Sequence, residues 1–183
     1  SWEQEQWEDL WNDIDELVPL PDGRHYMGAL VVESTSDRDF QIVDGQQRMA
    51  TLSILALAII ATLGEQTGSQ EEQTANQDRA RRLRERFIGE KDPASLLESS
   101  KLFLNETDNG FYQDYLVQLR TPTNPRGLPR SNRLLWDCFV WFKARLVARR
   151  ELRGEALAAL LSETVARKLL FILITVEDEL SAY

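Results

Sequence analysis

A run of fifteen residues without a charged side chain, residues 49–63, constrains this chain more than any other part of its sequence. Its residues are apolar on nearly every side of a helix, so a helix there needs protein around it. The run is too short to cross a bilayer, which takes about 20 residues. Asp44-Gly45 breaks the segment before it, so we expect a helix over residues 46–63, buried at the centre of the fold.

Cysteine and histidine are almost absent from the 183 residues, and this excludes several kinds of site. A single cysteine, Cys138, cannot form a disulfide framework or a Cys-based zinc site, and we expect an inert core thiol. A single histidine, His25, cannot build a His-rich metal centre or a two-histidine catalytic site. The chain opens with a polar, acidic helix rather than a signal peptide, so we expect a cytoplasmic protein with no membrane partner.

The remaining periodicity predicts a mixed α/β (α+β) fold. Apolar residues recur at steps of three and four over residues 7–18, which is typical of an amphipathic helix, and Ser1 with Gln4 would form its capping box. Trp7 and Trp11 lie on the apolar face of that helix and are expected in the core. Further helices are expected over residues 79–88, 108–119, 132–151 and 155–168.

Three segments are rich in β-forming residues and predict a small sheet. Residues 26–33 and 39–43 are separated by a short polar loop, which indicates a β-hairpin. Residues 169–176 form a compact apolar run that predicts a buried strand, and this strand would return to the sheet of the hairpin. Residues 64–78 contain two glycines and a Glu/Gln run, from which we expect an exposed, flexible loop.

Charge is distributed unevenly along the chain, although the net charge of −9 argues against a non-specific nucleic-acid binder. Residues 1–23 carry eight acidic groups and no Lys or Arg, whereas residues 120–153 carry nine basic groups and two acidic ones. Two interpretations are open: the charged faces are solvated or pair with each other, or the basic half faces phosphates. The candidate DNA-contacting residues are Arg126, Arg130 and Arg133.

The segment Asp44-Gly45-Gln46-Gln47-Arg48 contains the candidate site residues. It follows a strand and opens a helix, whose free backbone N–H groups and positive dipole end favour an anion. Arg48 can grip a phosphate with a planar fork of donors, and Asp44 can hold Mg²⁺ beside phosphate oxygens. Gln46 and Gln47 can position a water or contact polar ligand edges.

A purely structural interpretation of the same segment is also open. Asp44 can serve as the N-cap of the helix, with Gln47 as the reciprocal cap three residues on. Arg48 can pair with the acidic first helix, and Gly45 can serve only the turn. The segment is neither a phosphate-binding P-loop nor a Gly-x-Gly-x-x-Gly turn.

Asp-Gly-Gln-Gln-Arg at residues 44–48, preceded by Ile-Val, resembles the signature of the GmrSD-type restriction endonuclease N-terminal domain family. Residues 6–11 resemble the first helix of that family, and residues 25–31 resemble its first strand. Residues 101–115 and 171–183 resemble its helical half and closing strand. Two motifs that usually flank these segments are missing, so the chain resembles a fragment of the family domain, expected to be weakly active or inactive alone.

The resemblance implies a ParB/sulfiredoxin-like nucleotide-binding part over residues 1–63, the flexible loop 64–78, and a helical part over residues 79–183 with its closing strand. It further implies binding and hydrolysis of a nucleoside triphosphate (GTP, ATP or another) with Mg²⁺, coupled to DNA restriction. The binding residues carried over are Asp44, Gly45, Gln46, Gln47 and Arg48. Among them Asp44, Gln47 and Arg48 would be catalytic, and Asp44 would hold the metal.

The implied partners are foreign or modified DNA and a nuclease module in the same protein or in a partner chain, with a homodimer as an open option. An alternative function is a non-catalytic DNA-recognition module that uses the basic second half of the chain. Sulfiredoxin-like thiol chemistry is excluded because Cys138 lies far in sequence from residues 44–48.

Overall fold

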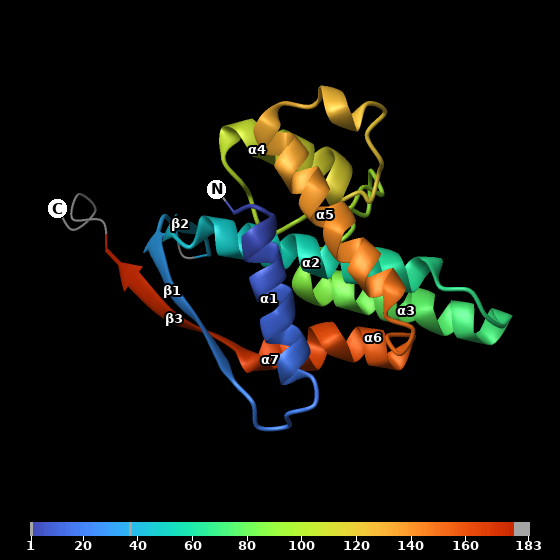
Figure 1. The fold of residues 1–183 in the computed structure, drawn as a ribbon. Helices are drawn as coiled ribbons and strands as arrows, with labels where there is room; N and C mark the ends of the chain where they lie inside the picture. The colour runs from blue at the N-terminus through green and yellow to red at the C-terminus, as the bar shows by residue number, and fades with distance from the viewer. Residues whose placement is uncertain (1, 37, 178–183) are drawn as a thin grey trace.

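The computed structural model describes residues 2–36 and 38–177 and has a mixed α/β architecture, as predicted. A small sheet stands at one side of a helical body (Figure 1). The elements, in chain order, are α1 (Gln4–Leu17), β1 (His25–Ser34), β2 (Phe40–Asp44), α2 (Gln46–Glu65), α3 (Gln70–Phe87), α4 (Glu106–Phe111), the π-helical turn η1 (Tyr112–Leu116), the 3₁₀ turn η2 (Pro125–Gly127), α5 (Arg130–Ala148), α6 (Glu155–Ala159), the π-helical turn η3 (Leu160–Val165), α7 (Ala166–Lys168) and β3 (Leu169–Val176).

Helix α2 lies at the centre of the helical body, which confirms the buried helix predicted from the uncharged run (Figure 1). Leu55, Leu57, Ile59 and Leu63 are completely buried, and α1, α3 and α5 contribute to the same hydrophobic cluster. By length and composition α2 is long and apolar enough to cross a membrane, yet 67% of its most apolar stretch is buried inside the protein. That environment is typical of a core helix.

The sheet has the strand order β2-β1-β3, and its topology confirms the sequence prediction. β1 pairs with β2 as an antiparallel hairpin, in which Val31 lies opposite Asp44. β1 pairs with β3 in parallel, from His25 opposite Leu169 to Glu33 opposite Val176. Helices α2 to α7 therefore all lie in the connection between the β1–β2 hairpin and β3, and this connection ties both halves of the chain to one sheet.

The expected burial of β3 is wrong. Only Leu169, at its start, is buried, whereas Ile172 is 54% exposed and Leu173 is 61% exposed. The reason is the position of the strand: β1 and β3 run side by side away from the helices, and β3 forms an edge of the sheet among the described residues (Figure 1). An apolar run indicates a strand but does not say what covers it.

Two helix boundaries also differ from expectation. The loop predicted over residues 64–78 is confined to residues 66–69, because Ser69 caps α3 and the Glu72 side chain returns a bond to the Ser69 backbone. Helix α1 begins at Gln4 with Glu3 as its N-cap, rather than with a cap at Ser1, which lies outside the described residues. In both cases the capping residues decide where the helix begins.

Candidate functional site

The turn between β2 and α2 requires glycine at position 45. Gly45 adopts a φ of 99°, and a Cβ there would lie 2.9 Å from Leu30 Cδ1. Gly45 itself is the N-cap of α2, while Asp44 Oδ1 accepts a hydrogen bond from the Gly45 backbone N–H at 3.0 Å. The interpretation of Asp44 as the N-cap is therefore wrong.

The start of α2 lacks a side-chain cap, as do the starts of α5 and α6. Ser69 caps α3 and Asn105 caps α4, whereas Gly45 has no side chain with which to cap α2. The first backbone N–H groups of α2 thus keep the donors and the partial positive charge that a helix start offers to an anion. This arrangement favours the anion-binding interpretation of the segment.

Arg48 lies one turn into α2 and reaches back across β1. Its Nη1 donates a hydrogen bond to the Met27 carbonyl at 2.9 Å, and its guanidinium lies directly over Gly28. A Cβ at Gly28 would lie 2.0 Å from Arg48 Nη1, so a larger residue there would displace the guanidinium from this position. Gly28 has a φ of 111° and stands at a bulge in the pairing of β1 with β3.

Gly28 is a site residue that the sequence analysis missed. The available signal was a glycine inside a run of β-forming residues, which often marks a bulge or a close approach of other atoms. Gly45 packs against Ala29 and Leu30, the next two residues of β1. The guanidinium of Arg48 and the start of α2 therefore lie beside consecutive residues of one strand.

Arg48 also lines a pocket of about 190 Å³ between α1 and β1. Trp2, Asp9, Asp13 and His25 line the same pocket. His25 Nε2 lies 3.1 Å from Asp13 Oδ2, and both side chains are more than one-third exposed. In the part of the chain that the structure describes, Arg48 forms no ion pair with the acidic helix, so that structural role is not observed.

The structure brings Gln47 and Arg48 toward this pocket and turns Gln46 away from it. Gln47 Oε1 lies 3.5 Å from the backbone N of Trp2, a weak contact. Gln46 Nε2 donates hydrogen bonds to the Ile42 and Val43 carbonyls, both at 3.0 Å, so its amide is occupied by the end of β2. Asp44 is exposed at the end of β2.

The predicted magnesium site would rest on a single carboxylate. Within residues 2–36 and 38–177 no group of three His, Cys, Asp or Glu side chains could hold a metal ion. Asp44 uses one oxygen for the Gly45 N–H and is otherwise exposed. This donor set fits Mg²⁺ because that ion is often held by one carboxylate together with substrate phosphates and waters.

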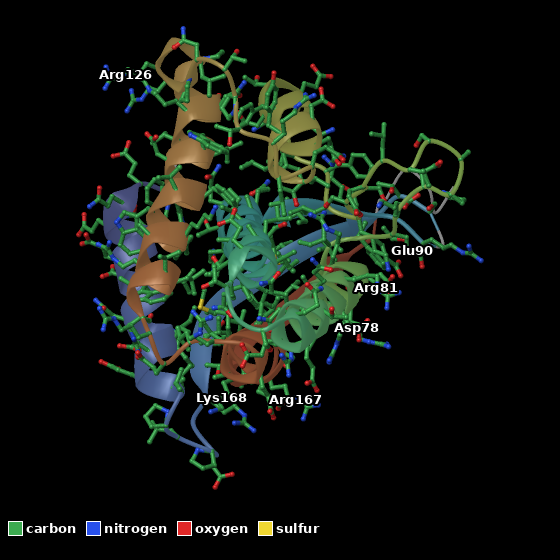
Figure 2. The ribbon with its side chains drawn as sticks, turned by 90° about the vertical axis from the view of Figure 1, so that its right-hand side faces the viewer. Asp78, Arg81, Glu90, Arg126, Arg167 and Lys168 are labelled. Carbon is green, nitrogen blue, oxygen red and sulfur yellow. The ribbon has the colours of Figure 1, made fainter. Side chains whose placement is uncertain are left out.

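The candidate DNA-contacting arginines lie at the end of the molecule where α5 begins. Arg126, Arg130 and Arg133 are all exposed, and Figure 2 shows Arg126 at this end. Arg130 Nη2 lies 3.3 Å from Glu3 Oε1, and Glu3 is the neighbour of Trp2 in the pocket wall. Of these three arginines, Arg130 is thus linked to the residue that follows Trp2 of the Arg48 pocket.

Other members of the basic half pair internally. Lys143 Nζ lies 2.7 Å from Glu65, and Arg149 Nη1 lies 2.7 Å from Asp15. The Arg149–Asp15 pair joins the basic half to the acidic first helix, as one of the two interpretations expects, whereas the partner of Lys143 belongs to α2. Trp7 and Trp11 are core residues as predicted, and burial raises the pKa of the Cys138 thiol, which fits an inert cysteine.

A strand, a left-handed glycine turn and an uncapped helix start therefore meet here, beside an arginine that crosses a second glycine. Residues 1–183 match the family model described as the GmrSD restriction endonuclease, N-terminal domain, and the chain belongs to this family. This membership supports a role in restriction. A comparison with curated proteins finds no match.

Proposed function

We propose that this domain binds and hydrolyses a nucleoside triphosphate, such as GTP or ATP, with its phosphates at the start of α2. Hydrolysis would drive or gate DNA cleavage by a nuclease module that lies in the same protein or in a partner chain. The observation that carries this proposal is the Arg48 guanidinium, held over Gly28 beside the uncapped helix start. Family membership supports the link to restriction.

In this proposal each residue of the segment 44–48 has its own role in phosphate hydrolysis. Arg48 donates one N–H to the Met27 carbonyl, and its other N–H groups can neutralise charge that develops on the phosphates. Gln47 is exposed beside the pocket and can position the attacking water. Asp44 would hold Mg²⁺, which supplies charge neutralisation between phosphate oxygens when it is bound. Gly45 and Gln46 hold the turn.

The proposed setting is the cytoplasm, where foreign or modified DNA and the nuclease module would be the partners. A homodimer is compatible with this proposal. Contact with DNA is supported by the exposed Arg126 and Arg133 and by Arg130, which pairs with Glu3, the residue after Trp2 of the Arg48 pocket.

Arg48→Ala in the intact protein tests the proposed hydrolysis. We expect the rate to fall on the order of 10³-fold or more, as for other arginines that contact a transferred phosphoryl group. Arg48→Lys should recover little, because an ammonium group lacks the planar fork. The matched control is Arg82→Ala, an exposed arginine of α3, which should keep the wild-type rate.

Thermal melts accompany each rate, because the proposal requires a folded variant. A folded Arg48→Ala protein with the wild-type rate would overturn the proposal, and so would a wild-type protein without nucleotide hydrolysis. If Arg48→Ala unfolds the domain, the milder Arg48→Lys variant decides: a folded Arg48→Lys protein with the full rate would also overturn it.

The exposed arginines at the start of α5 favour a second candidate function, DNA recognition without catalysis. Reversing Arg126, Arg130 and Arg133 to Glu should abolish DNA binding. Single reversals should each reduce the slope of log binding constant against log salt concentration by about one, because each removes one phosphate contact. The control is the same charge reversal at Arg81, Arg82 and Arg86, which are exposed on α3. If the Arg126, Arg130 and Arg133 variant binds DNA as tightly as the wild type, the DNA interface lies elsewhere on the protein.

A further inference from the structure

A second cavity lies at the other end of α2. It has a volume of about 530 Å³ and is lined by residues of α2, α3 and α5 and of the loop that follows α3. With 1.5 Å of rise per helical residue, its α2 residues Ile60 and Gly64 lie roughly 20 Å from Arg48 along the helix. Figure 2 shows Arg81 of α3, which lines the cavity, and Glu90 of the following loop on the same side of the molecule.

A buried guanidinium forms part of the cavity wall. Arg84 is only 8% exposed, and its Nη1 donates a hydrogen bond to the Val117 carbonyl at 2.7 Å. Its Nε lies 3.8 Å from Glu98 Oε2, which is beyond a hydrogen bond. Among the described residues no fully buried side-chain nitrogen lacks a partner, so the guanidinium nitrogens of Arg84 without a hydrogen bond are accessible to solvent, and Arg84 lines the cavity. The pKa of this guanidinium is lowered by burial, and the negative charge of Glu98 offsets only part of that effect.

Arg84 and Lys91, two cations of this wall, form no hydrogen bond to a carboxylate of the described residues. Lys91 Nζ lies 3.9 Å from Glu98 Oε1, so one carboxylate is shared by two cations and hydrogen-bonded to neither. Gln118 holds the loop in place, because its Nε2 donates to the Glu98 carbonyl at 2.6 Å and its Oε1 accepts from the Glu98 N–H at 3.2 Å. Glu98 therefore leaves the donors of Arg84 and Lys91 available, and Glu85 is the second carboxylate of this part of the lining.

The floor of the cavity is apolar and partly aromatic. Trp136 and Phe139 of α5 stack with their ring centroids 5.3 Å apart, and Ile60 of α2 lies beside them in the lining. Leu119 completes the lining with a φ of 54°, a left-handed backbone that leucine rarely adopts. Such strained residues cluster at ligand sites.

We propose that this cavity is a second ligand site, which takes a small aromatic anion of the nucleoside monophosphate type. The phosphate would be bound by the open donors of Arg84 and by Lys91, because a guanidinium fork matches two phosphate oxygens. The flat ring would lie over the apolar floor at Trp136 and Phe139. The lining combines charged side chains with an apolar, aromatic floor, which suits a ligand that has one anionic part and one flat apolar part.

Titration calorimetry on the protein tests the site with 2′-deoxynucleoside 5′-monophosphates, the matching nucleosides and inorganic phosphate. We expect the monophosphates to bind at least tenfold more tightly than either the nucleosides or phosphate. Lys91→Met should weaken binding several-fold without harm to the fold, because this side chain is 57% exposed. Lys101→Met, at an exposed lysine that does not line the cavity, is the matched control.

Glu98→Gln separates a ligand site from a merely structural ion pair. It removes the carboxylate that competes with the ligand for Arg84 and Lys91, so we expect tighter binding of the monophosphates. Arg48→Ala should leave this binding unchanged, which keeps the site distinguishable from the nucleotide site proposed above. The proposal is overturned if the monophosphates do not bind, if Lys91→Met and Glu98→Gln leave binding unchanged, or if Arg48→Ala abolishes it.

Discussion

Two arginines, Arg48 near the N-terminal end of α2 and Arg84 of α3 near its other end, are each fixed by a hydrogen bond to a backbone carbonyl. At the N-terminal end, Arg48 Nη1 donates to the Met27 carbonyl at 2.9 Å, beside the bulge at Gly28. At the other end, Arg84 Nη1 donates to the Val117 carbonyl at 2.7 Å, just after the π-helical turn η1. In both cases an irregular backbone presents a carbonyl to the guanidinium, and the other donors are left for a ligand.

The two arginines differ in what keeps them in place. Arg48 is half-buried and occupies the space that Gly28 leaves open by having no side chain. Arg84 is buried, and Glu98 lies close enough to offset its charge. The first site should therefore be sensitive to a single added atom, and the second to a change of charge.

Gly28→Ala should have the largest effect and should act only at the first site. The new Cβ would lie 2.0 Å from Arg48 Nη1, at a φ of 111° that alanine rarely adopts. We expect nucleotide hydrolysis to fall on the order of 10³-fold, as for Arg48→Ala, because the guanidinium must move. The backbone strain should lower the free energy of unfolding by about 1–3 kcal/mol. Steady-state rates and urea unfolding measure the two effects.

A double-mutant cycle identifies the clash as the cause. Once Arg48 is alanine, nothing opposes the Cβ at position 28 except the backbone strain, so the second substitution should cost less than it does alone. The expected coupling energy lies in the range of about 0.5–3 kcal/mol that residues in contact show. Strictly additive losses of stability would show that Gly28 does not hold a space for Arg48.

The features that the sequence predicts well each depend on a short run of neighbouring residues. The strand, glycine turn and buried helix around Asp44–Arg48 follow from the order of residue types, and so do the hairpin and β3. The roles of Gly28 and Arg84 depend on contacts between residues 20 and 33 positions apart, which a periodic pattern does not contain. The burial of β3 was predicted wrongly for the same reason, because the covering elements are distant in sequence.

The start of α3 is a different kind of error, because its signal is present in the sequence. Ser69 followed by Glu72 is a capping box that announces a helix, and the structure forms it. Gly64, Gly68 and the run of Glu and Gln residues are typical of a loop by composition, but the capping box starts a helix within this segment. A local motif with a mechanism should outweigh composition at such a boundary.

Labelling of Cys138 measures whether the two ends of α2 unfold together. The thiol is 2% exposed and burial raises its pKa, so a thiol reagent should not modify the folded protein. If one cooperative opening exposes it, Gly28→Ala should speed labelling about tenfold for each 1.4 kcal/mol of stability lost. Labelling that stays at the wild-type rate, despite a measured loss of stability, would show that the two ends open separately.

Two leucines with positive φ allow the smallest and most discriminating test of the second site. Leu96 has a φ of 59° and is 65% exposed, and it does not line the cavity, whereas Leu119 does. Because asparagine tolerates the left-handed region, Leu96→Asn should raise the free energy of unfolding by up to about 1 kcal/mol. Leu119→Asn relieves the same strain but loses apolar contact in the cavity wall, so its stability should change by less while monophosphate binding weakens. If the two variants gain equal stability and bind the monophosphates equally well, the strain at Leu119 serves the loop alone and has no part in the site.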